Sequence, residues 1–542
     1  MGKPSPKQTT QGHIMALPTE RNQIMRTSLT HPLMIDSFRL AEGKVGMTLC
    51  PGHKGPSLSG PNWDRDLQAD ILRLKLWRTD IVISLTPQDE MEHLDVGDIK
   101  AAMEGAGLLW LHLPIPDTGI PDTGWKQHWR RISPALHQRL EAGGRIVIHC
   151  RAGLERTALV AALLQCERGE SIGHALKQVA KARRGAGPLP RQKAWLEEQR
   201  QESDRNHRLF RACLFGGAIG DALGAEMEFW SLDHIRQTFP HGVDRILPHD
   251  GRPAAITDDT QMTLFTAEGL IRSDVRGSLK GICHPPGVVH HALLRWLTTQ
   301  GENPQIHDWA GLASDPRMHR RRAPGTTCLS SLKAAKHLGD VANNNSKGCG
   351  TIMRVAPVAL YGGVHCDTLA DDCSHLTHAH PTGRNAARAQ AHVLAQLLDR
   401  TPLEEAVRSL QTLRLDDATQ AAVERAWTAA PDGRPETVET LGQGWVAEEA
   451  LSIALYAARV ATSFEEGLRI AVTHSGDSDS TAAIAGNLLG LMFPDEVLAH
   501  PWRTQIECAD LIDRLAGDLC DARHHNTGER FALSMWEFYP GV

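Results

Sequence analysis

The sequence of 542 residues lacks several features that would place a protein in a simple class. It has no basic run of the kind that neutralises a phosphate backbone, and 58 basic and 64 acidic side chains leave a net charge of −6. Nucleic acid is therefore not indicated as a partner. No uncharged apolar stretch is long enough to span a membrane, and the first residues contain no apolar core of signal-peptide length. We expect a cytoplasmic protein that has no membrane partner.

The eleven cysteines are scattered without the paired spacing of a disulfide framework. In a long chain this distribution favours reduced thiols. A reducing environment would allow one of these thiols to work as a thiolate nucleophile.

A chain of this length is too long for one hydrophobic core, and its composition changes along the sequence. Residues 1–30 are polar and contain prolines, which predicts a flexible N-terminal arm. In residues 31–204, short apolar runs such as Thr79–Leu85 and Gly144–Cys150 alternate with helix-like segments, which predicts an α/β domain with a central, mainly parallel sheet. In residues 205–542 apolar residues recur at helical spacing, which predicts an all-α domain.

The segment HCRAGLERTA places Cys150 at the end of an apolar run, six positions before Arg156. If a strand, a loop and a helix follow one another here, the amides of the loop and of the first helical turn lack internal partners and form an anion cradle. The same field stabilises a thiolate, and the guanidinium of Arg156 can grip two phosphate oxygens. The phosphate-binding residues predicted from this pattern are Arg151, Ala152, Gly153, Leu154, Glu155 and Arg156.

This loop resembles the signature of the protein tyrosine and dual-specificity phosphatases. The segments GMTLCPGHK, LPIPDTGIPD and GAGPLPRQKAWLEE are similar to the cyclin-dependent-kinase-associated branch of that family. The resemblance implies that Cys150 attacks phosphorus, that Arg156 binds the phosphoryl group and that Thr157 helps the thiolate to leave. It also implies that Asp117 protonates the leaving oxygen, with Asp122 as the alternative acid.

The helical half contains two clusters of short oxygen-bearing side chains, ITDDTQMTL at 256–264 and HSGDSDSTAAIAGNLLG at 474–490. One aspartate before an apolar helix is often only a cap. Two such clusters exceed what capping needs, and their carboxylates would repel one another unless a cation lies between them. Hard oxygen ligands suit Mg²⁺, Mn²⁺ or Ca²⁺ better than zinc. We therefore predict a divalent metal site.

Together with the segments CLFGGAIGDALGAEMEF, GCGTIMRVAPVAL, LTHAHP and GWVAEEALSIALYA, these clusters resemble the ADP-ribosylglycohydrolase family. The resemblance implies two Mg²⁺ ions, with Mn²⁺ possible, held by Thr257, Asp258, Asp259, Asp477, Asp479 and Ser480. It implies an ADP-ribose groove lined by Ser346, Lys347, Gly348, Gly350 and His378. Asp259 is the first candidate for the catalytic base, and Glu228 is the second. Cys349 stands where the family often has asparagine, and Ser480 stands where threonine is common.

The two resemblances together predict a bifunctional hydrolase. One activity would be Mg²⁺-dependent cleavage of the N- or O-glycosidic bond of an ADP-ribosylated protein or small molecule. The other would hydrolyse a phosphorylated substrate through a phosphocysteine intermediate. The alternative is that one domain only binds ADP-ribose or phosphate and so targets the other. The sequence leaves open the linkage, the acceptor, the phosphatase substrate, whether one substrate uses both sites, and the oligomeric state.

Overall fold

The computed structural model describes residues 25–57, 60–303, 311–363, 366–524 and 538–539. The chain divides into two compact units. The first comprises Met1–Pro121, Gly144–Gln165 and Gly173–Gln192, and the second comprises Asp122–Gly143, Cys166–Ile172 and Lys193–Val542. The junction that the sequence predicts between residues 204 and 205 lies inside one helix, α7 (Pro190–Gly224), and the domain bounds stay a prediction.

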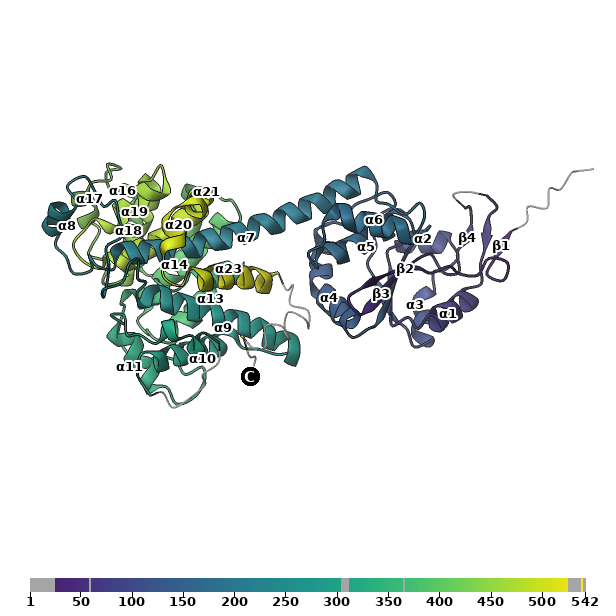
Figure 1. Ribbon diagram of the computed structural model, residues 1–542, viewed down its shortest axis with the longest axis horizontal. Helices are drawn as coiled ribbons and strands as arrows, with labels where there is room; N and C mark the ends of the chain where they lie inside the picture. Colours follow the sequence, from purple (N-terminus) through teal and green to yellow (C-terminus); the bar gives the residue numbers. More distant parts are fainter. Residues whose placement is uncertain (1–24, 58–59, 304–310, 364–365, 525–537, 540–542) are drawn as a thin grey trace, which may run out of the picture. The chain divides into compact units, whose positions relative to one another are not determined.

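The first unit is built on a five-stranded sheet with the order β2-β3-β8-β6-β7 (Figure 1). Its strands are β2 (Asp36–Leu40), β3 (Gly43–Leu49), β8 (Arg145–Cys150), β6 (Ile81–Ser84) and β7 (Leu109–His112). Strand β2 is antiparallel to β3, and the other pairs are parallel. This topology confirms the predicted α/β fold with a mainly parallel sheet.

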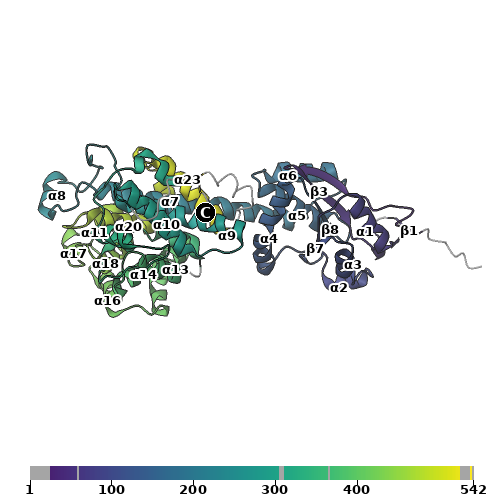
Figure 2. The ribbon, with the colours of Figure 1, turned by 90° about the horizontal axis from the view of Figure 1, so that it is seen from below.

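Helices cover both faces of this sheet. They are α1 (Leu67–Leu76), α2 (Gln88–His93), α3 (Ile99–Gly105), α5 (Glu155–Cys166) and α6 (Ile172–Ala182). Figures 1 and 2 show α5 and α6 on one side of the sheet and α1 and α3 on the other. Every residue of β6, and every residue of β8 after Arg145, is buried, as expected for parallel strands covered on both faces. Because β8 is the middle strand, its carboxyl end opens at the centre of the sheet edge, where such folds bind ligands.

A small second sheet has the order β1-β5-β4, with β1 at Arg26–Thr27, β5 at Trp63–Asp64 and β4 at Lys54–Gly55. The predicted N-terminal arm therefore contains a short strand at its end, since β1 pairs with β5. Residues 1–24 of that arm lie outside the described residues.

The described residues of the second unit form helices joined by loops and contain no strand ladder, only two isolated β-bridges, which confirms the predicted all-α fold. Its α-helices are α4 (Thr123–Glu141), α7, α8 (Leu232–Thr238), α9 (Asp258–Lys280), α10 (Pro285–Thr299), α11 (Thr326–Ala334), α12 (Ala356–Gly362), α13 (Cys366–His375), α14 (Pro381–Leu398), α15 (Leu403–Arg408), α16 (Asp417–Thr428), α17 (Pro435–Glu439), α18 (Ala447–Val460), α19 (Phe464–Val472), α20 (Ser478–Met492), α21 (Pro494–Ala499), α22 (Trp502–Gln505) and α23 (Ala509–Arg523). Short 3₁₀ turns lie at η1 (Gly311–Ser314), η2 (Pro316–Met318), η3 (Cys349–Thr351) and η5 (Ser409–Thr412). No helix in the described part of the chain combines the length and the apolar character that a membrane crossing requires.

Helix α20 lies in the core of this unit, because residues 478–491 are all buried. It runs beside α7, and the two backbones touch at glycines (Figure 1). A Cβ atom on Gly216 would lie 2.2 Å from the carbonyl oxygen of Gly486, and one on Gly220 would lie 2.0 Å from that of Ala482. The glycines spaced four apart in α7 therefore allow this helix pair to approach closely. The approach brings the end of α7 to the start of α20, since a Cβ on Gly224 would meet the backbone of Asp479.

We predict that Gly486→Ala lowers the unfolding free energy of the helical unit by about 1–3 kcal/mol, because the added methyl overpacks the helix crossing. Its Cβ would lie 2.1 Å from the oxygen of Gly216. The matched control is Gly277→Ala in α9, whose new Cβ meets nothing closer than 3.8 Å. Calorimetric unfolding of the full chain would measure both, and equal stability of the two variants would contradict the prediction.

Candidate functional site

Cys150 ends the central strand β8, and its side chain is buried. The chain then turns through residues 151–154 into α5, which begins at Glu155. Gly153 has φ +70°, and a Cβ there would lie 2.1 Å from the carbonyl oxygen of Thr48 at the end of the neighbouring strand β3. Only glycine fits this position, so the loop lies tightly against the sheet edge.

Arg183, which follows α6, fixes the conformation of this loop. Its Nε donates to the carbonyl oxygen of Gly153 at 2.7 Å, and its Nη2 donates to that of Ala152 at 3.0 Å. Asp36 on strand β2 holds the same guanidinium at 2.7 Å. The two loop carbonyl oxygens thus point toward Arg183 and accept its hydrogen bonds. This arrangement suits a loop whose amides bind an anion. The sequence analysis missed Arg183, because nothing local links it to a loop thirty residues earlier.

Arg156 lies in the first turn of α5, and its guanidinium is bound by carboxylates. Nη1 and Nη2 donate to the two oxygens of Glu90 at 2.7 and 3.0 Å, and Nη2 also lies 3.0 Å from Oδ1 of Asp117. Glu90 belongs to α2, which follows β6, the parallel neighbour of β8. The sequence analysis did not single out Glu90. An acidic residue just after the strand beside the cysteine strand is the signal that could have found it.

The two candidate acids occupy different environments. The side chain of Asp117 is 61% exposed and reaches the guanidinium of Arg156. Asp122 is the N-cap of α4, where its Oδ1 accepts from the backbone amide of Trp125 at 2.7 Å. Asp122 therefore has a structural role as a helix cap, and Asp117 is the candidate whose carboxylate contacts the arginine.

His149 and Thr157, which adjoin Cys150 and Arg156 in the sequence, are both buried. The hydroxyl of Thr157 is buried and has no hydrogen-bond partner among the described residues. Burial lowers the pKa of His149 to about 3, so its ring is neutral near pH 7. A neutral buried imidazole agrees with an orienting role for His149 rather than proton transfer.

In the helical unit, Glu228, Asp477 and Asp479 form a cluster in which one oxygen from each lies within 4.8 Å of the others. Asp477 and Asp479 are at the start of α20, and Glu228 lies just beyond the end of α7. The glycine contacts between these two helices bring the three carboxylates together. The sequence had placed Asp477 and Asp479 in one cluster and Glu228 in a separate segment.

Asp221 on α7 organises the start of α9, which carries the second acidic cluster. Its carboxylate accepts from the backbone amide of Thr257 at 3.0 and 3.1 Å, and from the amide of Thr260 at 3.1 Å and its hydroxyl. The side chain of Thr257 caps the helix by accepting from the amide of Asp259. The sequence analysis did not assign Asp221 a role, because its partners lie about 36 positions further along the chain.

The aspartates at the starts of α9 and α20 are buried, and among the described residues none of them forms an ion pair with a basic side chain. Asp259 and Asp479 are each 3% exposed, and Oδ1 of each has no hydrogen-bond partner in the described part of the chain. Burial, followed by the charges of neighbouring carboxylates, raises the pKa of Asp258, Asp259 and Asp479 well above the usual value. The same causes, burial first and then Asp477 and Asp221, raise the pKa of Glu228 to about 8.

Such an arrangement fits a divalent cation, because unpaired buried carboxylates are costly and a bound cation would satisfy them. The donors are carboxylate and hydroxyl oxygens, which suit Mg²⁺ or Mn²⁺. The residues at the helix starts that could hold the metal are Thr257, Asp258, Asp259, Asp477, Asp479 and Ser480.

The residues predicted for the ADP-ribose groove lie in and beneath the segment before η3. The hydroxyl of Ser346 lies 3.0 Å from that of Thr327, Lys347 forms an ion pair with Glu448, and Gly348 forms a β-bridge with Val446. A Cβ on Gly350 would lie 3.0 Å from Cε1 of His378. His378 is 1% exposed, and burial lowers its pKa to about 3, so it supports the loop from behind. Its contact with ADP-ribose stays a prediction.

An aromatic pair that the sequence analysis did not identify lies next to Glu228. Phe229 is 71% exposed and stacks on Trp445, with ring centroids 5.0 Å apart. Its φ of +69° is unusual for a bulky residue, and backbone strain of this kind collects at functional sites. This pair offers a flat apolar surface at the edge of the acidic cluster.

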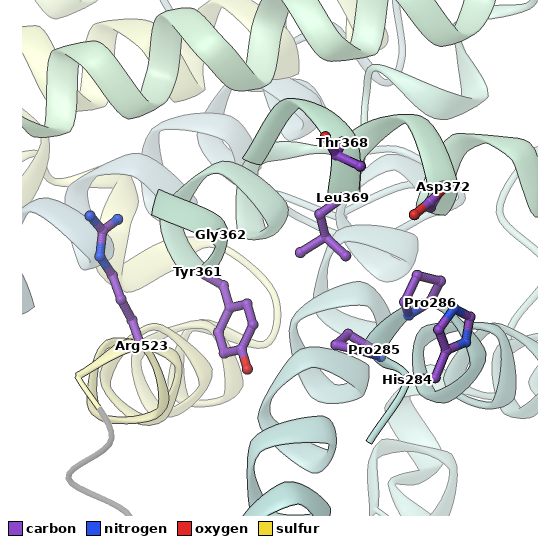
Figure 3. A pocket seen from close by; sticks show the side chains of 9 residues that line it. All are labelled: His284, Pro285, Pro286, Tyr361, Gly362, Thr368, Leu369, Asp372 and Arg523. Atoms are coloured by element: carbon purple, nitrogen blue, oxygen red, sulfur yellow. The ribbon is translucent and has the colours of Figure 1, made fainter. Parts of the chain in front are cut away.

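A separate cavity of about 430 Å³ lies among α10, α12, α13 and α23 (Figure 3). Its lining residues are His284, Pro285, Pro286, Tyr361, Gly362, Thr368, Leu369, Asp372 and Arg523. None of the carboxylates near α9 and α20 lines it. Figure 3 shows Leu369 in the middle of the labelled side chains, with the polar groups of His284, Tyr361, Thr368, Asp372 and Arg523 around it.

We predict that the unfolding free energy of the metal-free chain decreases less between about pH 5 and pH 8 in Asp479→Asn than in the wild type. A carboxyl whose pKa is raised on folding, such as Glu228 from 4.5 to about 8, binds its proton more tightly in the folded state and so costs stability as pH rises through this window. Removing one charge from the cluster should reduce this loss by at least about 1.4 kcal/mol, the equivalent of one pKa unit.

Denaturant titrations in EDTA at several pH values would measure the effect. The control is Asp233→Asn, which removes an exposed carboxylate of the same unit and should leave the pH dependence unchanged. Mg²⁺ should restore the stability of the wild type near pH 8. Identical slopes for the wild type and Asp479→Asn would argue against mutual repulsion in the cluster.

Comparison with known proteins gives a match for each part of the chain. A family model described as ADP-ribosylglycohydrolase matches residues 201–529, and a model described as Cyclin-dependent kinase inhibitor 3 (CDKN3) matches residues 44–176. The chain is 28% identical over 321 residues to an uncharacterized protein of Archaeoglobus fulgidus, a match that covers 57% of this chain and 95% of that protein. It is 24% identical over 355 residues to ADP-ribosylhydrolase ARH3 of Mus musculus, covering 57% of this chain and 90% of that protein.

For the first unit, the chain is 30% identical over 128 residues to Cyclin-dependent kinase inhibitor 3 of Rattus norvegicus. This match covers 24% of this chain and 57% of that protein. Both resemblances inferred from the sequence motifs are thereby confirmed. The chain belongs to the ADP-ribosylglycohydrolase family, and its N-terminal part is similar to cyclin-dependent kinase inhibitor 3.

Proposed function

We propose that this chain is a bifunctional hydrolase. The helical unit would cleave the N- or O-glycosidic bond of an ADP-ribosylated protein or small molecule, and the α/β unit would hydrolyse a phosphomonoester. The observation that carries the first activity is the convergence of the Glu228, Asp477 and Asp479 carboxylates at the start of α20. Family membership supports the same activity.

When bound, Mg²⁺ or Mn²⁺ would supply positive charge that holds the hydroxyl groups of the ribose next to the scissile bond. Asp259 is our first candidate for the base that takes a proton from the attacking water, because its Oδ1 has no other partner among the described residues. Glu228 is the second, because it is less buried than the aspartates. Ser346, Lys347, Gly348, Gly350 and His378 are proposed to form or support the ADP-ribose groove.

We predict that Asp258→Ala lowers the rate of ADP-ribose release by at least about 100-fold, the order of loss when an electrostatic catalytic group is removed. EDTA should have the same effect on the wild type, and Mg²⁺ should reverse it. Hydrolysis of an aryl phosphate by the same protein is the internal control and should not change. Tight calorimetric binding of ADP-ribose with no release from any substrate would favour the alternative, in which the helical unit is a binding module.

The second activity is supported by the arrangement of Cys150, Arg156 and Asp117. Cys150 would attack phosphorus and form a phosphocysteine, while the Arg156 guanidinium, held by Glu90, binds the phosphoryl oxygens. A phosphoryl group bound there would replace the Asp117 carboxylate at Nη2. Asp117 would then be free to protonate the leaving oxygen, and the Thr157 hydroxyl would assist departure of the thiolate when water attacks.

We predict that Asp117→Asn lowers kcat by about 10²–10⁴-fold for a substrate with an alkoxide leaving group, because a positioned general acid contributes about this much. The loss should be much smaller for an aryl phosphate whose phenolate leaves without a proton. Asp122→Asn is the matched control: it should keep kcat, and it should also keep the cap of α4, because asparagine caps a helix about as well as aspartate. If steady-state kinetics instead showed a loss of kcat in Asp122→Asn and none in Asp117→Asn, Asp122 would be the acid.

A cytoplasmic location is also part of the proposal. All eleven cysteines are free thiols, and a thiolate nucleophile requires a reducing environment.

A further inference from the structure

The side chain of Cys349 lies against the carboxylate cluster of the helical unit. Its Sγ is 2.9 Å from Oδ2 of Asp477, and the Ser480 hydroxyl donates to the same sulfur at 3.5 Å. Both neighbours belong to the start of α20 and are among the proposed metal ligands. Cys349 itself begins η3, which lies on a different part of the chain, so sulfur and carboxylate meet through the tertiary structure.

Packing fixes the position of this sulfur. The backbone amide of Cys349 donates to the carbonyl oxygen of Trp445 at 3.3 Å. On the following residue, a Cβ on Gly350 would lie 2.7 Å from Sγ of Cys328, so the turn is pressed against buried side chains. A backbone that is held at this residue and at the next one can present a side-chain atom to a site reproducibly.

A second observation beside the sulfur also indicates a cation site, namely buried carboxylate oxygens without a hydrogen-bond partner among the described residues. Oδ1 of Asp479 and Oδ1 of Asp259 are buried and unpartnered in the described part of the chain, in side chains that are each 3% exposed. Oxygens of Glu228, Asp477 and Asp479 converge within 4.8 Å. The sulfur therefore borders the same cluster of oxygens that requires a cation.

We propose that Cys349 Sγ is a ligand of the divalent cation at this centre, and that the centre selects borderline or soft ions such as Co²⁺, Zn²⁺ or Cd²⁺ over Mg²⁺. This inference rests on the metal centre of the proposed function. Metal–oxygen and metal–sulfur bonds of about 2.1 and 2.3 Å are compatible with an oxygen and a sulfur that lie close together. An ion bound to Asp477 Oδ2 is thus within reach of Cys349.

The binding step exchanges one proton for one metal bond. The S–H bond of Cys349 breaks, its proton leaves to solvent, and the electron pair on sulfur forms the bond to the cation, without oxidation or reduction. Thiolates prefer borderline and soft ions, whereas Mg²⁺ takes oxygen ligands. The oxygen ligands alone would therefore hold Mg²⁺, and the sulfur would increase affinity only for the softer ions.

Co²⁺ titration of the full metal-free chain tests the proposal, because a cobalt–thiolate bond gives a charge-transfer absorption band in the near ultraviolet. All proteins would carry Cys150→Ser, which removes the nucleophilic thiol of the other unit. We expect the band in this background, its loss in Cys349→Ser, and its retention in Cys283→Ser, the control that changes another partly buried thiol of the same unit. Affinity for Cd²⁺ should fall by about tenfold or more in Cys349→Ser, the scale of loss when a metal-site partner is removed. Mg²⁺ affinity should stay the same.

Three results would overturn the proposal, and they differ in whether the carboxylate metal centre is retained. If Co²⁺ binds without the band, and Asp477→Asn abolishes that binding, Cys349 is not a ligand but the carboxylate metal centre remains. If neither Co²⁺ nor Mg²⁺ binds the wild-type helical unit by calorimetry, both the ligand role and the metal centre of the proposed function fail. A band that persists in Cys349→Ser also excludes the ligand role.

Discussion

The main physical constraint on the helical unit is that its helices bring several carboxylates close together, where their charges repel. Asp258 and Asp259 begin α9, Asp477 and Asp479 flank the start of α20, and Glu228 follows α7. Three of these side chains share a space less than 5 Å across, and two keep an oxygen without a hydrogen bond among the described residues. Burial and mutual repulsion make the charged forms of these carboxylates costly, which raises their pKa values.

The glycines of α7 and α20 allow the close helix packing that brings these carboxylates together. Each replaces a side chain at a point where two backbones would otherwise be held apart, as at Gly216 and Gly486. Close helix packing therefore places negative charges in a buried environment in which their affinity for a proton, or for a metal ion, increases. The chemistry of the site and the packing of the core have the same origin.

The α/β unit uses the opposite arrangement of charge. Here the buried guanidinium of Arg156 contacts Glu90 and Asp117, and Arg183 donates hydrogen bonds to the loop carbonyls near Cys150. A phosphate would exchange places with one of these carboxylates rather than enter an empty positive pocket. The two units therefore carry opposite charges at these places: a guanidinium beside the cysteine loop in one and carboxylates at the helix starts in the other.

The sequence by itself determined the two fold classes, the central cysteine strand and the two acidic clusters, because each is a local pattern of apolar periodicity or of residue spacing. Tertiary structure alone decided that Glu90 binds Arg156, that Asp221 organises α9, and that the sulfur of Cys349 meets Asp477. It also decided that Asp122 caps a helix while Asp117 reaches the arginine. These contacts join residues from different elements, and a distance of a few ångströms between them depends on how whole helices and strands pack, which no local pattern encodes.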